Sequence, residues 1–396
     1  METTRTEAAD GGEITLVVAQ SPRYFPHVER HLNSLKQAFK RVRLLYWEKD
    51  AAEPLYALPG VESERVVLTF GGGGTFFFLR LMMGFYSKLR LMRPANIEAI
   101  DPYALIPARC AAIRNAWPGG GSRARLVYFS MEYFIALPSL RGKPIKRSIW
   151  KALERWGASG AASGATVSDS IAAHLRADFR IPIITVRNVP PRGGAPGAPG
   201  LGSEGRISAL HARCGLSAGA PIVIYQGMLQ VGRGLETSVR GVAAVPGTHF
   251  AIMGGGPLME PLRALAESLG CADRIHLLGE VGFRDLVALT RGALVGLAPI
   301  QSVSASYRYS LPGKLFEYIQ AGIPVVATSL PEIRKVVEGY GVGMCLEEFG
   351  SESLAGALRR LIGEPGLREG LLQNLPRAQA ELCWEAEEIR YLSLYR

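Results

Sequence analysis

The residues best suited to chemistry lie between positions 309 and 326, in the segment YSLPGKLFEYIQAGIPVV. Pro312 and Gly313 break the chain, and the pattern predicts a helix that begins near Lys314. The unpaired backbone N–H groups at such a helix start attract anions, and the Lys314 ammonium adds a full positive charge. Glu317 follows in the first predicted turn, where its carboxylate can accept hydrogen bonds from two vicinal hydroxyls or complement the helix dipole. The segment therefore favours a site for a diphosphate joined to a ribose.

A second candidate is the glycine-rich turn YQGMLQVGRGL at residues 225–235, which follows an apolar run and opens a predicted helix. Gly227 allows the backbone to approach a ligand closely. Arg233 lies at the helix start, where its guanidinium can hold a phosphate through two hydrogen bonds. An ordinary tight turn with a surface arginine gives the same pattern, so both interpretations stay open.

A third turn, MGGGP at residues 253–257, also comes directly after an apolar run. It lacks the GxGxxG spacing and the later acidic residue of a nicotinamide site, so an oxidoreductase is disfavoured. Close packing of a helix on a strand explains this turn as well as contact with a ligand does.

The elements around these turns alternate between short apolar runs and helical patterns. Strands are predicted at 13–20, 41–46, 66–70, 96–100, 125–129, 221–225, 249–253, 274–278, 294–299 and 324–327, and helices at 27–40, 102–115, 146–159, 234–245, 259–269, 283–291, 314–321, 353–361 and 378–395. This alternation is typical of βαβ units and parallel sheets. Ligands of such sheets bind at the carboxyl ends of the strands, next to helix starts.

A Pro- and Gly-rich segment, NVPPRGGAPGAPGLGSEG at residues 188–205, has no apolar periodicity and cannot build a core. We therefore expect an N-terminal domain of residues 1–188, a linker at 189–206 and a C-terminal domain of residues 207–380. Each domain is expected to be a doubly wound α/β sheet.

The composition, with 48% hydrophobic and 20% charged residues, is that of a folded protein. The five cysteines form no CxxC pair, so neither a disulfide framework nor a zinc site is indicated, and a reducing cytoplasm fits best. The net charge of +10 fits either a solvated basic surface or attraction to anionic partners such as nucleotide diphosphates or lipid phosphates. No basic run interleaves with aromatic residues, which disfavours nucleic acid as a partner.

One apolar segment, TFFFLRLMMGFYSKLRLM at residues 75–92, is interrupted by Arg80, Lys88 and Arg90. It is too short and too charged for a membrane-spanning helix. Two interpretations stay open: a buried helix whose basic side chains reach the surface, or a basic amphipathic helix lying on the inner face of a membrane.

Taken in order, the motifs of the second half resemble those of the retaining glycosyltransferases of family four. The loop G-R-L-x-x-x-K-G of that family is matched from Gly227, with Arg233 on its lysine. The motifs G-x-G-P and L-G-x-V are matched at 254–257 and 278–281. Glu317 matches the second glutamate of E-x7-E, and residues 321–327 match the A-G-x-P-V-V-A that follows it. The first half is similar to a narrower subgroup at residues 128–134 (YFSMEYF), 149–154 (IWKALE), 167–172 (VSDSIA) and 187–190 (RNVP).

The resemblance implies an α/β fold called GT-B, with two Rossmann-like doubly wound parallel-sheet domains facing a cleft. The last helix, at about residues 381–396, would pack back on the first domain. The second domain would bind a UDP-, GDP- or TDP-linked sugar, and the first an acceptor hydroxyl of a glycan, a lipid-linked saccharide or a natural product. The leaving phosphate would itself act as the base, so the resemblance implies neither a metal nor a cofactor.

The resemblance also assigns roles. Arg233 and Lys314 would stabilise the charge of the leaving diphosphate. The remaining donor-site residues would be Gly227, Met228, Gly254, Gly279, Val281, Tyr309, Leu311, Pro312, Gly313, Leu315 and Glu317. Asp101, Glu132 and Tyr133 would lie on the acceptor side.

Four positions depart from the family pattern. Tyr309 replaces a glutamate that contacts the donor sugar, and Met228 replaces the arginine of the first loop. Met131 and Phe129 replace a histidine and an aspartate of the first half. Two other hypotheses therefore stay open: a nucleotide-sugar epimerase on the same fold, and a donor-binding subunit with impaired catalysis.

Overall fold

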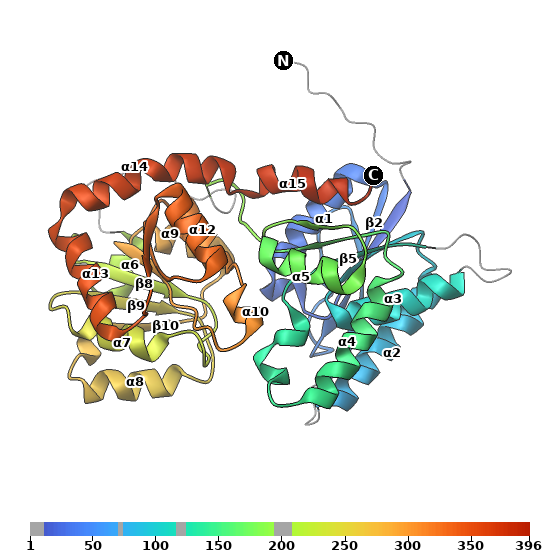
Figure 1. Ribbon diagram of the computed structural model, residues 1–396, viewed down its shortest axis with the longest axis horizontal. Helices are drawn as coiled ribbons and strands as arrows, with labels where there is room; N and C mark the ends of the chain where they lie inside the picture. The colour runs from blue at the N-terminus through green and yellow to red at the C-terminus, as the bar shows by residue number, and fades with distance from the viewer. Residues whose placement is uncertain (1–11, 70–73, 116–123, 194–207) are drawn as a thin grey trace, which may run out of the picture. The chain divides into compact units, whose positions relative to one another are not determined.

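The computed structural model describes residues 12–69, 74–115, 124–193 and 208–396 of the chain. The chain divides into two compact units (Figure 1). The first comprises Met1–Arg187 together with the C-terminal Glu388–Arg396, and the second comprises Asn188–Glu387. Most of the predicted linker at 189–206 lies outside the described residues.

A parallel sheet of seven strands forms the centre of the first unit. The strands are β1 (Glu13–Val18), β2 (Arg41–Glu48), β3 (Val61–Val67), β4 (Asn96–Ile100), β5 (Arg125–Ser130), β6 (Ser163–Thr166) and β7 (Ile183–Thr185). Their order is β3-β2-β1-β4-β5-β6-β7, and all neighbours are parallel. The chain direction across the sheet therefore reverses between β1 and β4, which is the switch point of a doubly wound sheet.

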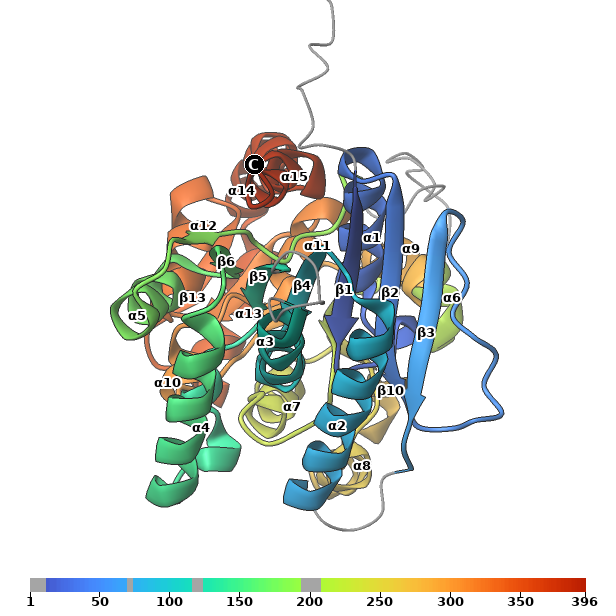
Figure 2. The same cartoon turned by 90° about the vertical axis from the view of Figure 1, so that its right-hand side faces the viewer.

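Helices cover this sheet. They are α1 (Pro26–Ala38), α2 (Gly74–Met92), α3 (Pro102–Asn115), α4 (Pro144–Ala158) and α5 (Asp169–Phe179), with short 3-10 turns η1 (Pro22–Tyr24), η2 (Phe134–Ala136) and η3 (Pro138–Leu140). Helices α2, α3 and α4 lie side by side over one face of the sheet (Figure 2). Because both faces are covered, the central strands are apolar throughout, and Ile14, Leu16 and Val17 of β1 are fully buried.

The last residues of the chain are attached to the first unit by a buried carboxylate. Glu98 of β4 is fully buried and bonds to His31 Nδ1 at 2.8 Å. It also accepts hydrogen bonds from the hydroxyls of Tyr391 and Tyr395, which belong to helix α15 (Trp384–Ser393) and the residues after it. The Arg125 guanidinium donates to the carbonyl groups of the last three residues. These bonds explain why residues 388–396 belong to the first unit.

The second unit has a parallel sheet of six strands in the order β10-β9-β8-β11-β12-β13. The strands are β8 (Ile222–Gln226), β9 (His249–Met253), β10 (Ile275–Gly279), β11 (Val295–Ala298), β12 (Val325–Thr328) and β13 (Gly343–Leu346). The switch point here lies between β8 and β11. The two units thus repeat one sheet topology.

The helices of the second unit are α6 (Ala209–Cys214), α7 (Leu235–Ala243), α8 (Met259–Ser268), α9 (Phe283–Thr290), α10 (Ala305–Arg308), α11 (Gly313–Ala321), α12 (Pro331–Tyr340), α13 (Ser351–Gly363) and α14 (Pro365–Glu381), with the 3-10 turn η4 (Ala272–Arg274). One core joins β8, β9 and β11 to α7, α8 and α13. Its buried members include Tyr225, Val239, Phe250, Leu262 and Leu354.

Two predicted elements differ in the structure, and several observed ones, such as β6, β7, β13, α5 and α12, were not predicted. The third strand spans Val61–Val67 and not 66–70, because it pairs only with β2 at the sheet edge, where the polar run Glu62–Arg65 is tolerated. The predicted helix at 378–395 is two helices, because Leu382 leaves the helical conformation between α14 and α15.

Helix α2 combines features of both interpretations of segment 75–92. Phe77, Leu81, Phe85 and Leu89 recur at a spacing of four residues and are buried against the unit. Leu79, Met83 and Leu91 are exposed, at 50%, 60% and 76%. Of the basic residues, Lys88 pairs with Glu64 at 3.0 Å. No helix among the described residues is both long and apolar enough to cross a bilayer.

Candidate functional site

Two cations lie at the carboxyl end of the second sheet, beside the switch point. Lys314 is the second residue of α11, and its Nζ lies 3.5 Å from the centre of the Tyr225 ring at the end of β8. Arg233, just before α7, stacks on Tyr307 of α10, with its Cζ 4.7 Å from the ring centre. Both contacts are cation–π interactions. They hold the two cations near the strand and helix ends through aromatic rings instead of carboxylates.

The environment of Lys314 disfavours its charge. Burial lowers the pKa of Lys314 well below its ordinary value, the nearby Arg233 guanidinium lowers it further, and the Glu317 carboxylate opposes them. A position that holds two like charges close together in a partly desolvated place is one that an anion would stabilise. Lys314 and Arg233, predicted separately from two motifs, are thus brought into one positive site.

The start of α11 adds backbone donors to this site. Pro312 is its N-cap, and among the described residues the N–H groups of Gly313 and Lys314 have no hydrogen-bond acceptor. The next N–H group, that of Leu315, is not free, because it donates to the Pro312 carbonyl at 3.1 Å. Two aligned N–H groups and the helix dipole remain to attract an anion.

Glu317 lies beyond the first turn and not within it, because α11 begins one residue earlier than predicted, at Gly313. Its carboxylate accepts a hydrogen bond from the side-chain amide of Gln226, the last residue of β8. The Gln226 amide oxygen in turn accepts from Thr290 Oγ1 at 2.9 Å. This chain of bonds orients the Glu317 carboxylate, and helix-dipole complementation no longer explains its position.

The glycine turns of the site pack on one another through their backbones. Gly227 N–H donates to the Met253 carbonyl at 2.9 Å, and Gly254 N–H donates to the Gly279 carbonyl at 2.8 Å. A Cβ atom on Gly254, whose φ is +142°, would lie 2.0 Å from the Gly227 carbonyl oxygen. The MGGGP turn therefore needs glycine for contact between two loops, a reason that differs from both interpretations made from the sequence.

The other predicted donor-site residues have varied environments. Met228 is 59% exposed, and Val281 is half-buried. The Leu311 and Leu315 side chains are buried, and the Leu315 N–H is already bonded to Pro312. Tyr309 ends α10, three residues before the N-cap of α11.

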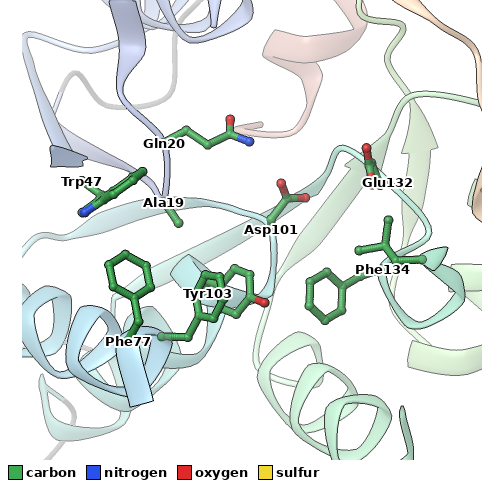
Figure 3. Close-up of a pocket in the computed structure, with 10 residues that line it drawn as sticks. Ala19, Gln20, Trp47, Phe77, Asp101, Tyr103, Glu132 and Phe134 are labelled. Atoms are coloured by element: carbon green, nitrogen blue, oxygen red, sulfur yellow. The ribbon is translucent and has the colours of Figure 1, made fainter. Parts of the chain in front are cut away.

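A second candidate site lies at the switch point of the first sheet. A cavity of about 320 Å³ opens where β1 and β4 end, and it is lined by the predicted acceptor-side residues Asp101 and Glu132 (Figure 3). The third predicted residue, Tyr133, does not line it, and its ring stacks on His174 at 5.1 Å.

Asp101 has an unusual backbone conformation and a carboxyl group with an unusual pKa. Its φ is +64°, a conformation that costs energy outside glycine and is often found at functional sites. Its Oδ1 accepts a hydrogen bond from the Met131 N–H at 2.8 Å. Burial raises the pKa of Asp101 to about 7, the Met131 N–H opposes this, and the Glu132 carboxylate adds to it. The side chain can therefore exchange a proton near neutral pH.

Sequence reasoning missed the aromatic wall of this cavity. Its rings come from four separate places in the chain: Trp47, Phe77 and Phe78, Tyr103, and Phe134. Tyr103 and Phe134 closely follow strands β4 and β5, and that position was the available signal.

Sequence comparison finds a family match within the second unit. Residues 220–364 match the family described as "Glycosyl transferases group 1". The chain is 25% identical to alpha-D-kanosaminyltransferase of Streptomyces kanamyceticus, with 47% of this chain and 48% of that protein covered. It is 29% identical to D-inositol 3-phosphate glycosyltransferase of Acidothermus cellulolyticus, with 46% and 42% covered. The chain therefore spans about half the length of these curated relatives or less.

Comparison with solved structures covers both units. Sucrose-phosphate synthase from Thermosynechococcus elongatus has a TM-score of 0.78 at 16% identity, with 97% of this chain and 98% of that chain covered. The Anabaena protein HepE, solved in complex with UDP and glucose, has a TM-score of 0.72 at 14% identity, with 96% and 98% covered. The predicted GT-B fold, with two parallel-sheet α/β domains, is confirmed.

Proposed function

We propose that the chain transfers a sugar from a nucleotide-diphosphate donor to an acceptor hydroxyl, because residues 220–364 match the family of group 1 glycosyl transferases. The second unit would bind the donor, with UDP, GDP or TDP as the nucleotide, and the first unit the acceptor, in the cytoplasm. The acceptor would be a glycan, a lipid-linked saccharide or a small natural product.

The observation that carries this proposal is the positive site at the start of α11. Lys314, Arg233 and the N–H groups of Gly313 and Lys314 gather around one point at the switch point of the sheet. A diphosphate placed there would gain a charge partner on each side. Glu317, held by Gln226, would accept the two ribose hydroxyls.

Breakage of the sugar–phosphate bond builds negative charge on the leaving diphosphate, and fixed positive groups lower the barrier by stabilising that charge. Since Lys314 and Arg233 can supply the positive charge that a metal ion would otherwise provide, we propose a metal-independent reaction. We also propose retention of configuration, with a diphosphate oxygen taking the proton of the attacking hydroxyl on the face from which the diphosphate leaves.

Thermal unfolding with a panel of UDP, GDP, TDP, ADP and CMP sugars would test the donor class. We expect one diphosphate nucleotide to raise the unfolding temperature, because binding to the native state alone stabilises it by mass action. CMP sugars carry one phosphate and should have little effect. If no diphosphate nucleotide stabilises the chain, the proposal is wrong.

The best donor would then be incubated without and with acceptors, and the sugar product followed by mass spectrometry and NMR. An epimerase would convert the sugar without any acceptor. A subunit with impaired catalysis would bind the donor but transfer its sugar to no acceptor. This outcome is tested because Tyr309, Met228 and Met131 depart from the family pattern. Transfer with retained anomeric configuration supports the proposal.

We also propose a peripheral contact of the first unit with anionic lipid, through the exposed face of α2. Leu79, Met83 and Leu91 are exposed there, and Arg80 and Arg90 are exposed on the same helix. The chain should sediment with phosphatidylglycerol vesicles more than with phosphatidylcholine vesicles, and the Leu79→Glu, Met83→Glu double variant should not. Equal sedimentation of both proteins would contradict this contact.

A further inference from the structure

We propose that the cavity of the first unit selects an apolar, ring-bearing acceptor that donates hydrogen bonds and carries no phosphate. This inference rests on the proposed function, in which the first unit binds the acceptor. It names the chemical class of that acceptor.

The shape and surface of the cavity are set by a connected series of aromatic rings. Trp47 meets Phe77 edge to face at 5.5 Å, and Phe77 meets Phe78 at 5.2 Å. Phe78 stacks on Tyr103 at 3.9 Å with the planes 8° apart, and Tyr103 meets Phe134 at 5.4 Å. Rings held in this way form a rigid apolar wall against which a flat ring or an alicyclic ring can stack.

The polar groups of the cavity are few and mostly accept hydrogen bonds. The lining includes Gln20, Asp101 and Glu132, and Figure 3 shows their side chains at the edge of the cavity. The Gln20 Oε1 atom is buried and has no hydrogen-bond donor among the described residues. The Asp101 Oδ1 atom accepts the Met131 N–H, and no residue that the structure describes donates to Oδ2. A ligand hydroxyl or amino group would satisfy Gln20 and Asp101.

Gln20, Asp101, Glu132 and the Tyr103 hydroxyl are few polar groups for a polyol. A sugar or inositol presents hydroxyls around its whole ring, and those facing Phe77, Phe78 and Phe134 would lose water without gaining a partner. The wall therefore favours an acceptor with at least one apolar face.

The charge of the cavity argues against a phosphorylated acceptor. Its described lining holds two carboxyl groups and no lysine, arginine or histidine. A phosphate there would face the Glu132 carboxylate, and above pH 7 the Asp101 carboxylate as well, with no lysine, arginine or histidine in the described lining to pair with. The contrast with the Lys314 and Arg233 site is direct, since that site has the composition suited to phosphate. The relative named for inositol 3-phosphate has an acceptor of the class that this cavity disfavours.

Calorimetric titration of the full chain with four probes tests the inference: 2-naphthol, 2-naphthyl phosphate, myo-inositol and myo-inositol 1-phosphate. We expect 2-naphthol to bind at least tenfold more tightly than each of the other three, because only it pairs an apolar ring with an uncharged donor. Equal or tighter binding of either phosphate, or of inositol, would overturn the inference.

Variants of neighbouring phenylalanines assign the binding to the cavity. Phe78→Ala removes the ring stacked on Tyr103 and should weaken 2-naphthol binding at least tenfold, whereas Phe76→Ala, on the same helix but 68% exposed, should change it less than twofold. Phe78→Leu keeps apolar volume and protects the test against misfolding. Equal effects of Phe76→Ala and Phe78→Leu would contradict the assignment.

Substitution of the carboxyl groups tests the charge argument. Asp101→Asn and Glu132→Gln together should bring the affinities for 2-naphthol and 2-naphthyl phosphate at least threefold closer, because they remove the like charges. An unchanged ratio would contradict this argument. Titration of UDP into the same preparation distinguishes failure of this inference from failure of the proposed function. UDP binding without 2-naphthol binding refutes this inference alone. Absence of binding by every nucleotide diphosphate refutes the proposed function.

Discussion

The Nζ atom of Lys314 lies 3.5 Å from the centre of the Tyr225 ring, and this contact joins the start of α11 to the end of β8. It holds an ammonium group at the switch point of the second sheet. Burial and the neighbouring Arg233 lower the pKa of this group well below its ordinary value, so its charge is poorly stabilised until an anion arrives.

Nucleotide binding should take up protons. A bound diphosphate favours the charged form of Lys314 and raises its pKa, so the complex holds more protons than the free chain at pH values above the free pKa. UDP, or the preferred nucleotide, should be titrated by calorimetry in Tris and in PIPES, which have different ionisation enthalpies. The difference between the two binding heats gives the number of protons taken up, which should be up to about one per site. The affinity should rise as pH falls. Lys314→Met should abolish the buffer dependence, and identical heats for the unaltered chain in both buffers would contradict the prediction.

Glu317→Ala should weaken nucleotide binding by about tenfold or more, since hydrogen bonds to a charged group each contribute about 1.5–3 kcal/mol. The 2′,3′-dideoxy form of the same nucleotide should bind the original chain and the variant equally, because it lacks the hydroxyls that Glu317 would accept. Glu338→Ala, an exposed glutamate on α12, is the control. If Glu317→Ala weakened the binding of the ribonucleotide and of its dideoxy form by the same factor, the ribose contact would be refuted.

Two glycines at opposite ends of β9 should respond differently to alanine. Gly254 and Gly247 both have positive φ, at +142° and +72°, but only at Gly254 would a Cβ atom meet backbone, 2.0 Å from the Gly227 oxygen. Gly247→Ala should cost about 1 kcal/mol of unfolding free energy, and Gly254→Ala at least about 2 kcal/mol more. Gly254→Ala should also weaken nucleotide binding, because it displaces the loop that precedes Arg233. Urea unfolding and calorimetry check both, and equal costs would contradict the loop contact.

Asp101→Asn should flatten the dependence of stability on pH. With a pKa of about 7 in the folded chain, Asp101 keeps its proton between pH 4 and 7 while the unfolded chain loses it. The folded state then binds more protons, so the free energy of unfolding falls as pH rises, by up to about 4 kcal/mol for a shift of this size. Asparagine does not titrate, so the stability of the variant relative to the original chain should grow from pH 4 to 7. A constant difference would contradict the raised pKa.

Much of the proposed donor site could be predicted from the sequence because its residues are local. Lys314, Glu317 and the glycine turns lie within single βα connections, where a break in periodicity and a helix start fix the position of a side chain. The prediction failed by one residue at the start of α11, and this moved Glu317 out of the first turn. Cap positions depend on backbone hydrogen bonds, such as that from Leu315 to Pro312, which apolar periodicity does not encode.

The acceptor cavity could be predicted only in part. Asp101 and Glu132 follow predicted strands, but Trp47, Phe78 and Tyr103 come together through strand order and helix packing. Nothing in their spacing distinguishes them from ordinary core residues. Gln20 was missed for the same reason, since its significance lies in a buried oxygen without a donor.

The most direct test of the central claim is the rate of sugar transfer by Lys314→Ala and Arg233→Ala, each measured with the best donor and acceptor. The control is Lys335→Ala, a lysine of α12 that pairs with Glu332. We predict that each site variant loses on the order of 10²-fold or more in kcat, since each removes a group that stabilises the leaving diphosphate. The control should keep the original rate. Near-original turnover in both site variants would contradict the claim that this positive site drives the reaction.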